Sequence, residues 1–220
     1  MRFAMINGSP KMKNSATEII LNMIKDGMQG MDLCVPVDVY WDTKGVKEES
    51  LEEVASCDTL VLAFPLYVDC IPSHVVRWMK AFEQYVKENK AEKKYRVFAV
   101  VNCGFYEAKH NLQAIEVVRN WSQHLDAVFC SGLAIGAGGM IVGVYEKFKC
   151  NGPLKPINEK ARELTAKIIY EPYQNGDVVM VQPAFPSPLY LAASHGMWKS
   201  EAKKNGLTVQ DLSMKTWDRG

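Results

Sequence analysis

The stretch FAMINGSPKMKNSAT, residues 3–17, decides how this chain folds. Its opening residues FAMI are apolar at every position, which is typical of a central strand in a parallel sheet. The strand ends at Asn7-Gly8, and the capping-box pattern Ser15-Ala16-Thr17-Glu18 marks the start of a helix. Small polar and cationic side chains lie between them, where the first N–H groups of the helix need acceptors. The loop therefore fits either an anion-binding site or an ordinary strand-turn-helix with a good N-cap.

The composition of the whole chain sets broad bounds. With 220 residues, of which 48% are hydrophobic, the chain suits one domain with an extension and a full core. The 26 Lys and Arg residues balance 25 Asp and Glu residues, so charge gives no case for nucleic acid or an anionic membrane as a partner. Met1-Arg2-Phe3 leads straight into the strand without a signal-peptide pattern, and no apolar run has transmembrane length. We therefore expect a soluble cytoplasmic protein.

The six cysteines indicate buried thiols rather than disulfides or a metal site. Cys34, Cys57 and Cys130 lie in or beside apolar strand-like runs, where free thiols are common. No two cysteines have the C-x-x-C spacing of a redox or zinc site, and the four histidines show no ligand spacing. We therefore expect no bound metal.

Strand-like and helical patterns alternate along the chain. The expected strands are residues 3–6, 33–40, 59–64, 96–101 and 127–135. The expected helices are residues 18–28, 48–56, 72–86, 111–125 and 157–170. Pro36 favours a sheet edge or a bulge for the second strand. The alternation predicts an α/β fold, in which a doubly wound, mostly parallel sheet of five strands is covered by helices on both faces.

Unusual loops follow four of the five expected strands. Strands one, three, four and five run into NGSPKMKNSAT, PLYVDCIP, NCGFYE and GAGGM, whereas strand two ends in the plain polar segment WDTKG. In sheets of this kind ligands bind at the carboxyl ends of the strands, near the point where the strand order reverses. We therefore expect the four loops to share one rim.

Three of these loops have a chemistry of their own. The first lacks both the P-loop pattern and the dinucleotide fingerprint, so one terminal phosphate fits it best. Pro65-Leu66-Tyr67-Val68 offers a rigid turn and a ring for a flat heteroaromatic, although Tyr67 alone also fits a half-buried core position. Residues 102–106 add amides at a glycine turn and two rings, or form a simple turn. A phosphate pocket, a flat platform and edge amides together indicate FMN.

The chain resembles the flavodoxin-like family of NADPH-dependent FMN reductases and NAD(P)H:quinone oxidoreductases. The matching motifs, all within residues 1–170, are Gly8-Ser9-Pro10-Lys11 with Ser15 and Thr17, Pro65-Leu66-Tyr67 with Pro72, and Asn102-Cys103-Gly104. The resemblance implies the strand order 2-1-3-4-5, an FMN-binding domain over residues 1–172 and a homodimer. It also implies that the phosphate would be held by Ser9, Lys11, Asn14, Ser15, Ala16 and Thr17. The flavin ring would be surrounded by Pro65, Leu66, Tyr67, Val68, Asn102, Cys103, Gly104 and Tyr106. A flat substrate would land on Tyr67, Phe105 and Tyr106.

Two departures from related flavoproteins narrow the interpretation. Some relatives carry a cysteine cluster after the second strand, where an iron–sulfur centre binds, but residues 40–45 here are YWDTKG. Electron-carrier flavodoxins tend to be strongly acidic with a Thr-rich phosphate loop, whereas this chain is nearly neutral. We therefore expect no iron–sulfur centre, and the pure carrier interpretation is weakened.

The tail, residues 173–220, is expected to be an extension with one amphipathic helix. Prolines at 183, 186 and 188 break the chain, and residues 189–205 then show a helical pattern that Gly206 ends. The apolar face of this helix consists of Leu191, His195, Trp198 and Ala202. That face could pack on its own domain, cover the flavin edge or bind a second subunit.

These patterns lead to one main hypothesis and two alternatives. The main hypothesis is hydride transfer from NAD(P)H through FMN to a small acceptor, such as a quinone, a nitro or azo compound, or free flavin. No acid–base residue is expected, because the flavin carries the chemistry. Cys103 is a weak candidate for a nucleophile. The first alternative is an electron-transfer flavoprotein reduced by a protein partner. The second, a phosphate-binding response domain, is disfavoured because Asn7 stands where an acidic cluster would bind magnesium.

Overall fold

The computed structural model describes residues 2–11, 13–28, 37–38, 48–89, 93–170, 172, 174 and 176–215, with the backbone alone at 37–38. The chain divides into two compact units, residues 1–184 and residues 185–220. Each unit is described by itself.

The first unit is built on a parallel sheet of six strands in the order β2-β1-β3-β4-β5-β6. The strands are β1 (Phe3–Asn7), β2 (Val37–Asp38), β3 (Thr59–Pro65), β4 (Arg96–Asn102), β5 (Val128–Ile135) and β6 (Val178–Val181). Every residue of β1 is buried, as its apolar sequence requires. The predicted order of the first five strands is confirmed. The other residues of the strand expected over 33–40 lie outside the described part.

The sixth strand was not predicted. Its sequence VVMV falls in the segment that the sequence analysis placed in the extension, and it pairs with β5 from Gly132↔Val178 to Ile135↔Val181. The approach of the chain to β5 is tight at Gly176, where a Cβ atom would lie 1.6 Å from the carbonyl oxygen of Cys130. Such a contact is invisible in the sequence, and a four-residue apolar run between prolines is a weak signal.

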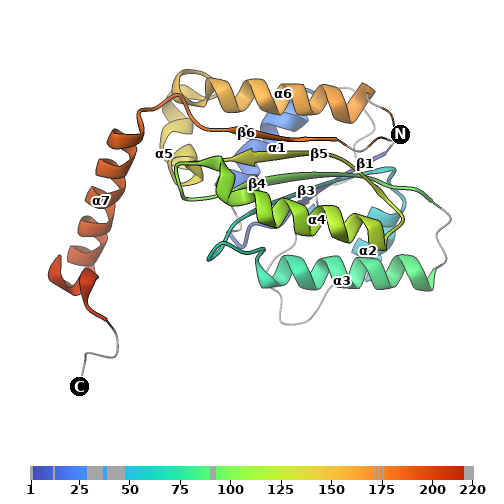
Figure 1. The fold of residues 1–220 in the computed structure, drawn as a ribbon, viewed down its shortest axis with the longest axis horizontal. Helices are drawn as coiled ribbons and strands as arrows, with labels where there is room; N and C mark the ends of the chain where they lie inside the picture. The colour runs from blue at the N-terminus through green and yellow to red at the C-terminus, as the bar shows by residue number, and fades with distance from the viewer. Residues whose placement is uncertain are drawn as a thin grey trace. The chain divides into compact units, whose positions relative to one another are not determined.

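Helices cover both faces of this sheet (Figure 1). The α-helices are α1 (Ala16–Asp26), α2 (Glu48–Ala55), α3 (Ser73–Glu88), α4 (Leu112–His124), α5 (Gly138–Phe148), α6 (Lys155–Tyr170) and α7 (Ser187–Lys204). Short 3₁₀ helices are η1 (Ala108–Asn111), η2 (Gly152–Leu154) and η3 (Gln210–Ser213). One apolar core lies between the sheet and α2, α3 and α4, and a second lies between the sheet and α1, α5 and α6. The doubly wound architecture is therefore confirmed.

Aromatic side chains fill the first core. The rings of Trp78 and Phe82 in α3 stack with centroids 5.2 Å apart and planes 9° from parallel. Trp121 of α4 lies 6.3 Å from both rings, and Tyr95 meets Phe82 edge-on at 5.8 Å. Large aromatic rings packed in this way stabilise the fold by more than the burial of their apolar area alone. The cluster fixes α3 and α4 against the same face of the sheet.

Helix α5 was not predicted, because the sequence indicated only a glycine-rich loop after the fifth strand. The sequence GGMIVGVYEKF forms eleven residues of helix that start at Gly138. Glycine lowers helix propensity, and no side chain caps the start, since Ala137 occupies the N-cap position at φ 52°. Ile141 packs into the second core. This tertiary contact stabilises the helix although its local sequence has a low helix propensity.

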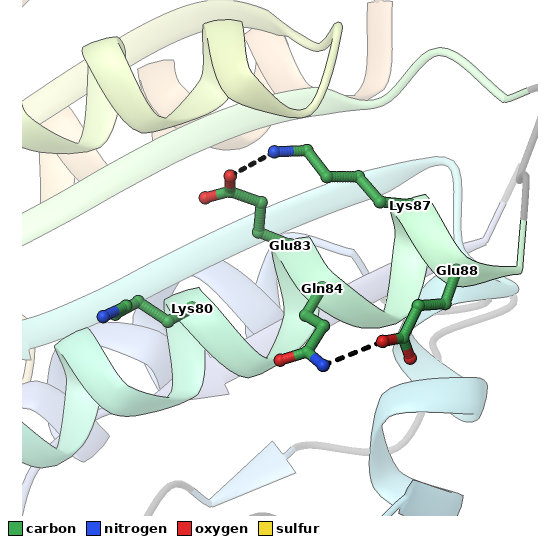
Figure 2. A pocket seen from close by; sticks show the side chains of 5 residues that line it. All are labelled: Lys80, Glu83, Gln84, Lys87 and Glu88. Carbon is green, nitrogen blue, oxygen red and sulfur yellow. Dashed lines mark hydrogen bonds and ion pairs between the residues drawn. The ribbon is translucent and has the colours of Figure 1, made fainter.

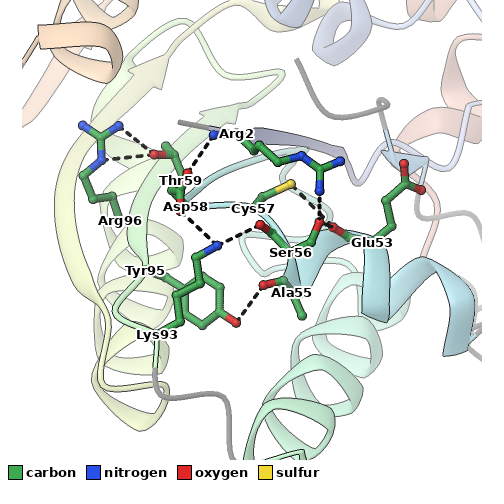
Figure 3. Close-up of polar contacts among 10 residues, drawn as sticks. All are labelled: Arg2, Glu53, Ala55, Ser56, Cys57, Asp58, Thr59, Lys93, Tyr95 and Arg96. Carbon is green, nitrogen blue, oxygen red and sulfur yellow. Dashed lines mark hydrogen bonds and ion pairs between the residues drawn. The ribbon is translucent and has the colours of Figure 1, made fainter. Parts of the chain in front are cut away.

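Polar contacts hold the strand starts together at the amino end of the sheet (Figure 3). The Arg2 N–H donates to the Asp58 carboxylate over 2.8 Å, and Lys93 pairs with the same carboxylate at 2.9 Å. Arg96, which is fully buried, donates to the Thr59 hydroxyl and to a carbonyl in the last turn of α6. These contacts therefore lie at the amino ends of the strands, whereas the four unusual loops lie at the opposite edge of the sheet, after the carboxyl ends.

The described cysteines form no disulfides with one another, and those at positions 57 and 130 are buried as predicted. Cys34 lies outside the described residues. Within the described chain, no three His, Cys, Asp or Glu side chains group so as to hold a metal ion. None of the helices in the described ranges combines the length and the apolar composition needed to cross a membrane.

The second unit contains α7 and η3. Helix α7 covers the residues expected to be helical, apart from Asn205, and most of the expected apolar face is exposed. Leu191 and Trp198 of that face are 51% and 61% exposed, and Leu189 and Met197 are exposed elsewhere on the helix. Leu191 and Trp198 are seven residues apart and share one side of the helix, whereas Leu189 and Met197 lie on other sides, so the exposed apolar side chains are not confined to one stripe.

Candidate functional site

The carboxyl ends of β1, β3, β4 and β5 meet at one edge of the sheet. Asn102 at the end of β4 is in register with both Pro65 of β3 and Ile135 of β5, and Asn7 of β1 is in register with Ala63. Four loops leave this edge and are named by the elements they join: β1–α1 (residues 8–15), β3–α3 (66–72), β4–η1 (103–107) and β5–α5 (136–137). The predicted convergence of these loops on one rim is confirmed.

The β1–α1 loop is shaped by its own polar groups. The Asn7 side-chain oxygen accepts from the Ser9 N–H at 3.1 Å, and the Ser9 hydroxyl accepts from the Lys11 N–H at 3.3 Å. The Lys11 ammonium donates to the carbonyl of Asn14 at 3.0 Å, and Asn14 takes the left-handed conformation at φ 53°. Asparagine tolerates this conformation better than most residues. The loop thus closes on itself and carries a positive charge.

The start of α1 has the predicted capping box. The Ser15 hydroxyl accepts from the Glu18 N–H at 3.0 Å, and the Glu18 carboxylate accepts from the Ser15 N–H at 3.4 Å. The capping box leaves the first-turn amides of Ala16 and Thr17, which a helix cannot satisfy internally. An anion at this position would therefore meet the positive end of the helix dipole.

Three buried hydroxyl groups lie around the start of α1, and all three have the same hydrogen-bonding pattern. Ser9, Ser15 and Thr17 are 2%, 4% and 1% exposed. Each hydroxyl oxygen accepts a hydrogen bond from the protein, and none of the three hydroxyl hydrogens has an acceptor among the described residues. A buried donor hydrogen left without an acceptor lowers the stability of the fold by about 1–3 kcal/mol. The arrangement therefore favours an anionic ligand, which can only accept, over a plain N-cap.

Asn102 links this loop to the centre of the sheet. Its side-chain amide donates to the Thr17 hydroxyl oxygen at 2.9 Å and to the Phe64 carbonyl at 3.4 Å, and the residue is 3% exposed. The side chain expected to contact a ring is therefore committed to a contact within the protein. This bond fixes the position of the Thr17 hydroxyl oxygen.

The β3–α3 loop forms a tight hairpin at the rim. The backbones of Tyr67 and Cys70 exchange hydrogen bonds of 3.0 and 3.1 Å across Val68 and Asp69, which have φ values of 50° and 59°. Positive φ is strained for a β-branched residue, and such strain clusters at functional sites. Tyr67 is 50% exposed, so its side chain is partly open to solvent.

The β4–η1 loop holds a buried thiol. Cys103 donates through sulfur to the carbonyls of Phe105 and Glu107, and it accepts from the Asn111 amide. Burial raises the pKa of the Cys103 thiol, and the charges of Asp69 and Glu107 raise it further; the hydrogen bond from the Asn111 amide lowers it by less. A thiol that stays protonated is a poor nucleophile.

Two further contacts join the β4–η1 loop to the start of α5. A Cβ atom at Gly136 would lie 2.0 Å from the Tyr106 carbonyl oxygen, and the Gly138 N–H donates to the Cys103 carbonyl over 2.7 Å. Phe105 is 49% exposed and its ring lies 4.4 Å from the His110 ring. Two half-exposed aromatic rings, Tyr67 and Phe105, therefore stand on loops of the same rim.

Comparison with solved structures supports this picture of the fold. An NADPH-quinone reductase from P. pentosaceus superposes with a TM-score of 0.55 at 14% identity, over 75% of this chain and 98% of that one. A WrbA-like flavodoxin from Agrobacterium tumefaciens superposes with a TM-score of 0.51 at 10% identity, over 76% and 94%. This chain has the flavodoxin-like fold. General stress protein 14 of Treponema denticola, solved in complex with FMN, superposes with a TM-score of 0.54 at 12% identity, over 76% and 97%. No protein-family model matches the sequence, and no curated protein matches it.

The flavodoxin-like fold brings every predicted site residue to the same rim. The phosphate-side residues lie in the β1–α1 loop and the first turn of α1; these are Ser9, Lys11, Asn14, Ser15, Ala16 and Thr17. The ring-side residues lie at the ends of β3 and β4 and in the loops that follow; these are Pro65, Leu66, Tyr67, Val68, Asn102, Cys103, Gly104, Phe105 and Tyr106. Backbone N–H groups of Leu66 and Cys103 are already donated to Asn102 and Ile135, so they cannot serve a ligand.

Some residues at the rim of the flavodoxin-like fold were missed. Gly136 and Gly138 were noticed as part of an unusual loop, but close backbone approach cannot be seen in a sequence. His74 was noted only as a scattered histidine, yet its Nε2 atom lies 3.0 Å from the Gly8 carbonyl oxygen. A lone histidine in a helical pattern carries no signal for such a contact.

A separate hollow lies along the second half of α3 (Figure 2). Its lining side chains pair with one another: Lys87 with Glu83, and Gln84 with Glu88. Helix α3 starts at the rim and runs back along the sheet, so this hollow is remote from the four loops. Charged side chains satisfied within one helix face indicate a solvated surface, not a second ligand site.

Proposed function

We propose that this chain is an FMN-dependent oxidoreductase that uses NAD(P)H to reduce a small acceptor, such as a quinone, a nitro or azo compound, or free flavin. The observation that carries the proposal is the set of three buried hydroxyls at the start of α1, each of which has its hydrogen left to donate. Proteins of the same fold, an NADPH-quinone reductase and a protein solved with FMN, support the choice of cofactor.

The phosphate of FMN would be held by this chain at the β1–α1 loop. The hydroxyls of Ser9, Ser15 and Thr17 would donate to it, together with the first-turn amides of α1. The Lys11 ammonium, anchored on the Asn14 carbonyl, would add a fixed positive charge. Because the loop has neither the P-loop pattern nor the dinucleotide fingerprint, the site suits a terminal phosphate rather than a pyrophosphate.

The ring of FMN would lie between the β3–α3 and β4–η1 loops. When bound, FMN supplies the hydride-transfer chemistry. The chain supplies the surroundings: Tyr67 and Phe105 present half-exposed rings on which a flat substrate can stack, with Tyr106 beside them. The raised pKa of Cys103 fits a neutral thiol in the wall of the site rather than a catalytic nucleophile. No acid–base residue of the protein is required.

A titration with FMN tests the proposal. We expect FMN fluorescence to be quenched on binding, and the bound flavin to be bleached within seconds by NADH or NADPH in the absence of oxygen. A protein that binds no FMN contradicts the proposal. Bound flavin that dithionite bleaches and NAD(P)H does not would support the alternative, an electron-transfer flavoprotein reduced by a protein partner. The homodimer and the cytoplasmic location stay predictions from the sequence.

A further inference from the structure

His74 lies at the first turn of α3 and has no part in the site as assigned above. It is 5% exposed, and its Nε2 atom lies 3.0 Å from the carbonyl oxygen of Gly8. Gly8 opens the β1–α1 loop, and α3 begins directly after the β3–α3 loop. One side chain therefore connects the loops on the two sides of the proposed cofactor site.

The chemistry of this contact fixes the direction of the hydrogen bond. Burial lowers the pKa of His74 and the charge of Arg77 lowers it further, and these effects outweigh the contact with Gly8, which raises it. The imidazole is therefore neutral near pH 7. A carbonyl oxygen can only accept, so Nε2 carries the hydrogen and donates it. The bond does not depend on a charge.

Gly8 is held at both of its peptide groups. Its N–H donates to the Ala63 carbonyl of β3 at 2.7 Å, while its carbonyl accepts from His74. A Cβ atom at Gly8 would come within 2.6 Å of Val75 Cγ2, so the first turn of α3 packs directly on this backbone. Only glycine fits between the strand and the helix. The path of the chain into Ser9 is thereby set by α3.

We propose that His74 is a positioning residue that holds the β1–α1 loop in its anion-binding shape by tying Gly8 to α3. It does not touch the phosphate; it sets where the Ser9 hydroxyl and the loop amides point. That the anion is the phosphate of FMN rests on the proposed function. The loop-holding role itself rests only on the contacts with Gly8.

The experiment compares FMN with riboflavin, which has the same ring and lacks the phosphate. We expect His74→Phe, which removes the donor and keeps an aromatic ring at this position, to weaken FMN binding about tenfold, the effect of losing one buried hydrogen bond. Riboflavin binding should change less than about twofold on the same scale. His74→Gln, whose side-chain N–H₂ group can reach the same carbonyl, should restore most of the loss. Equal weakening of both flavins, or of neither, would overturn the proposal.

A second readout decides the matter without any flavin. Amide hydrogen exchange at Ser9 and Lys11, whose N–H groups are bonded within the loop, should become faster in His74→Phe. Thr165→Val is the matched control, because it also removes a buried side-chain contact, to Ala161 and to the far end of α1 at Ile24. It should leave exchange at these amides unchanged. If the native protein binds no flavin, the proposed function fails, yet unchanged exchange in His74→Phe would separately overturn the role of His74. If His74→Phe does not fold, His74→Leu takes its place.

Discussion

The side-chain amide of Asn102, at the end of β4, donates to the hydroxyl oxygen of Thr17, in the first turn of α1, over 2.9 Å and across 85 residues of sequence. Both residues are buried. The bond leaves the Thr17 hydroxyl hydrogen to point elsewhere, so a contact between two elements of the fold also orients a donor at the proposed phosphate site. We therefore expect this one hydrogen bond to contribute both to the stability of the fold and to the binding of a phosphate.

Replacing Thr17 by valine tests this double role. Thr17→Val keeps the shape of the side chain but leaves the Asn102 amide short of one acceptor, so the free energy of unfolding should fall by about 1–3 kcal/mol. FMN binding should weaken as well. Urea denaturation measures the first effect and fluorescence titration the second. Thr165→Val, a buried threonine in α6, should lose stability without losing FMN affinity. FMN affinity unchanged in Thr17→Val would refute the role in binding.

The two tryptophans of the aromatic core should differ in their sensitivity to substitution. The Trp121 indole N–H donates to the Met79 carbonyl at 3.1 Å, whereas the Trp78 indole N–H is buried without an acceptor among the described residues. Substitution by phenylalanine removes the same atoms from each. Trp121→Phe should therefore cost about 1 kcal/mol more than Trp78→Phe, the net value of one hydrogen bond. Urea denaturation of the two variants gives the comparison, and an equal or reversed order would be inconsistent with the contacts.

Two thiols at the rim should react very differently. Cys70 is exposed, whereas Cys103 is buried and its pKa is raised, first of all by that burial. A disulfide reagent at pH 8 should label Cys70 quickly in the folded protein and Cys103 only after unfolding, as peptide mapping would show. Cys70→Ser is the control that removes the fast reaction. Because the folded pKa is raised, the stabilising contribution of the neutral thiol is complete below about pH 8.5 and is lost as the pH rises through the folded pKa.

The contacts at Asp58 predict a loss of stability in acid. Burial alone would raise the pKa of Asp58, but hydrogen bonds from Lys93 and the Arg2 N–H, with the charge of Lys93, lower it overall. A lowered pKa stabilises the fold above the ordinary value of about 3.9, and this contribution is lost as the pH falls through the folded pKa. Asp58→Asn should therefore be less stable than the native chain at pH 7, with the difference shrinking below pH 4.

The matched control for Asp58 is Glu116→Gln, which breaks an exposed ion pair with Arg119. Such pairs contribute little, about 0–1 kcal/mol. Thermal unfolding from pH 3 to pH 7 compares the two variants with the native chain. A constant difference between Asp58→Asn and the native chain over this range would contradict the assignment.

Most of the fold could be predicted because its strands are short apolar runs separated by helical patterns. The central strands at residues 59–65 and 96–102 are buried on both faces, so neither needs a neighbour to be recognised. Helix α5 and strand β6 could not be predicted in this way. The first starts with two glycines and has no side-chain cap, and the second is four residues long and is defined by its pairing with β5.

The loops of the site could be predicted, but the roles of single residues could not. The convergence of the four loops on one rim could be predicted, because topology alone brings the carboxyl ends of parallel strands together. Whether a side chain faces a ligand or another part of the protein depends on tertiary contacts. Asn102 forms a hydrogen bond with Thr17, and His74 forms one with Gly8, and neither contact can be predicted from the local sequence.

The contact between Gly136 and the Tyr106 carbonyl has a practical consequence for protein engineering. The β4–η1 loop and the start of α5 are fitted backbone to backbone, so they behave as one interchangeable part. Residue 136 has to stay glycine when residues 103–107 are exchanged, because a side chain there would collide with the carbonyl of residue 106. A graft that carries residues 136–138 along with residues 103–107 keeps this close backbone approach intact.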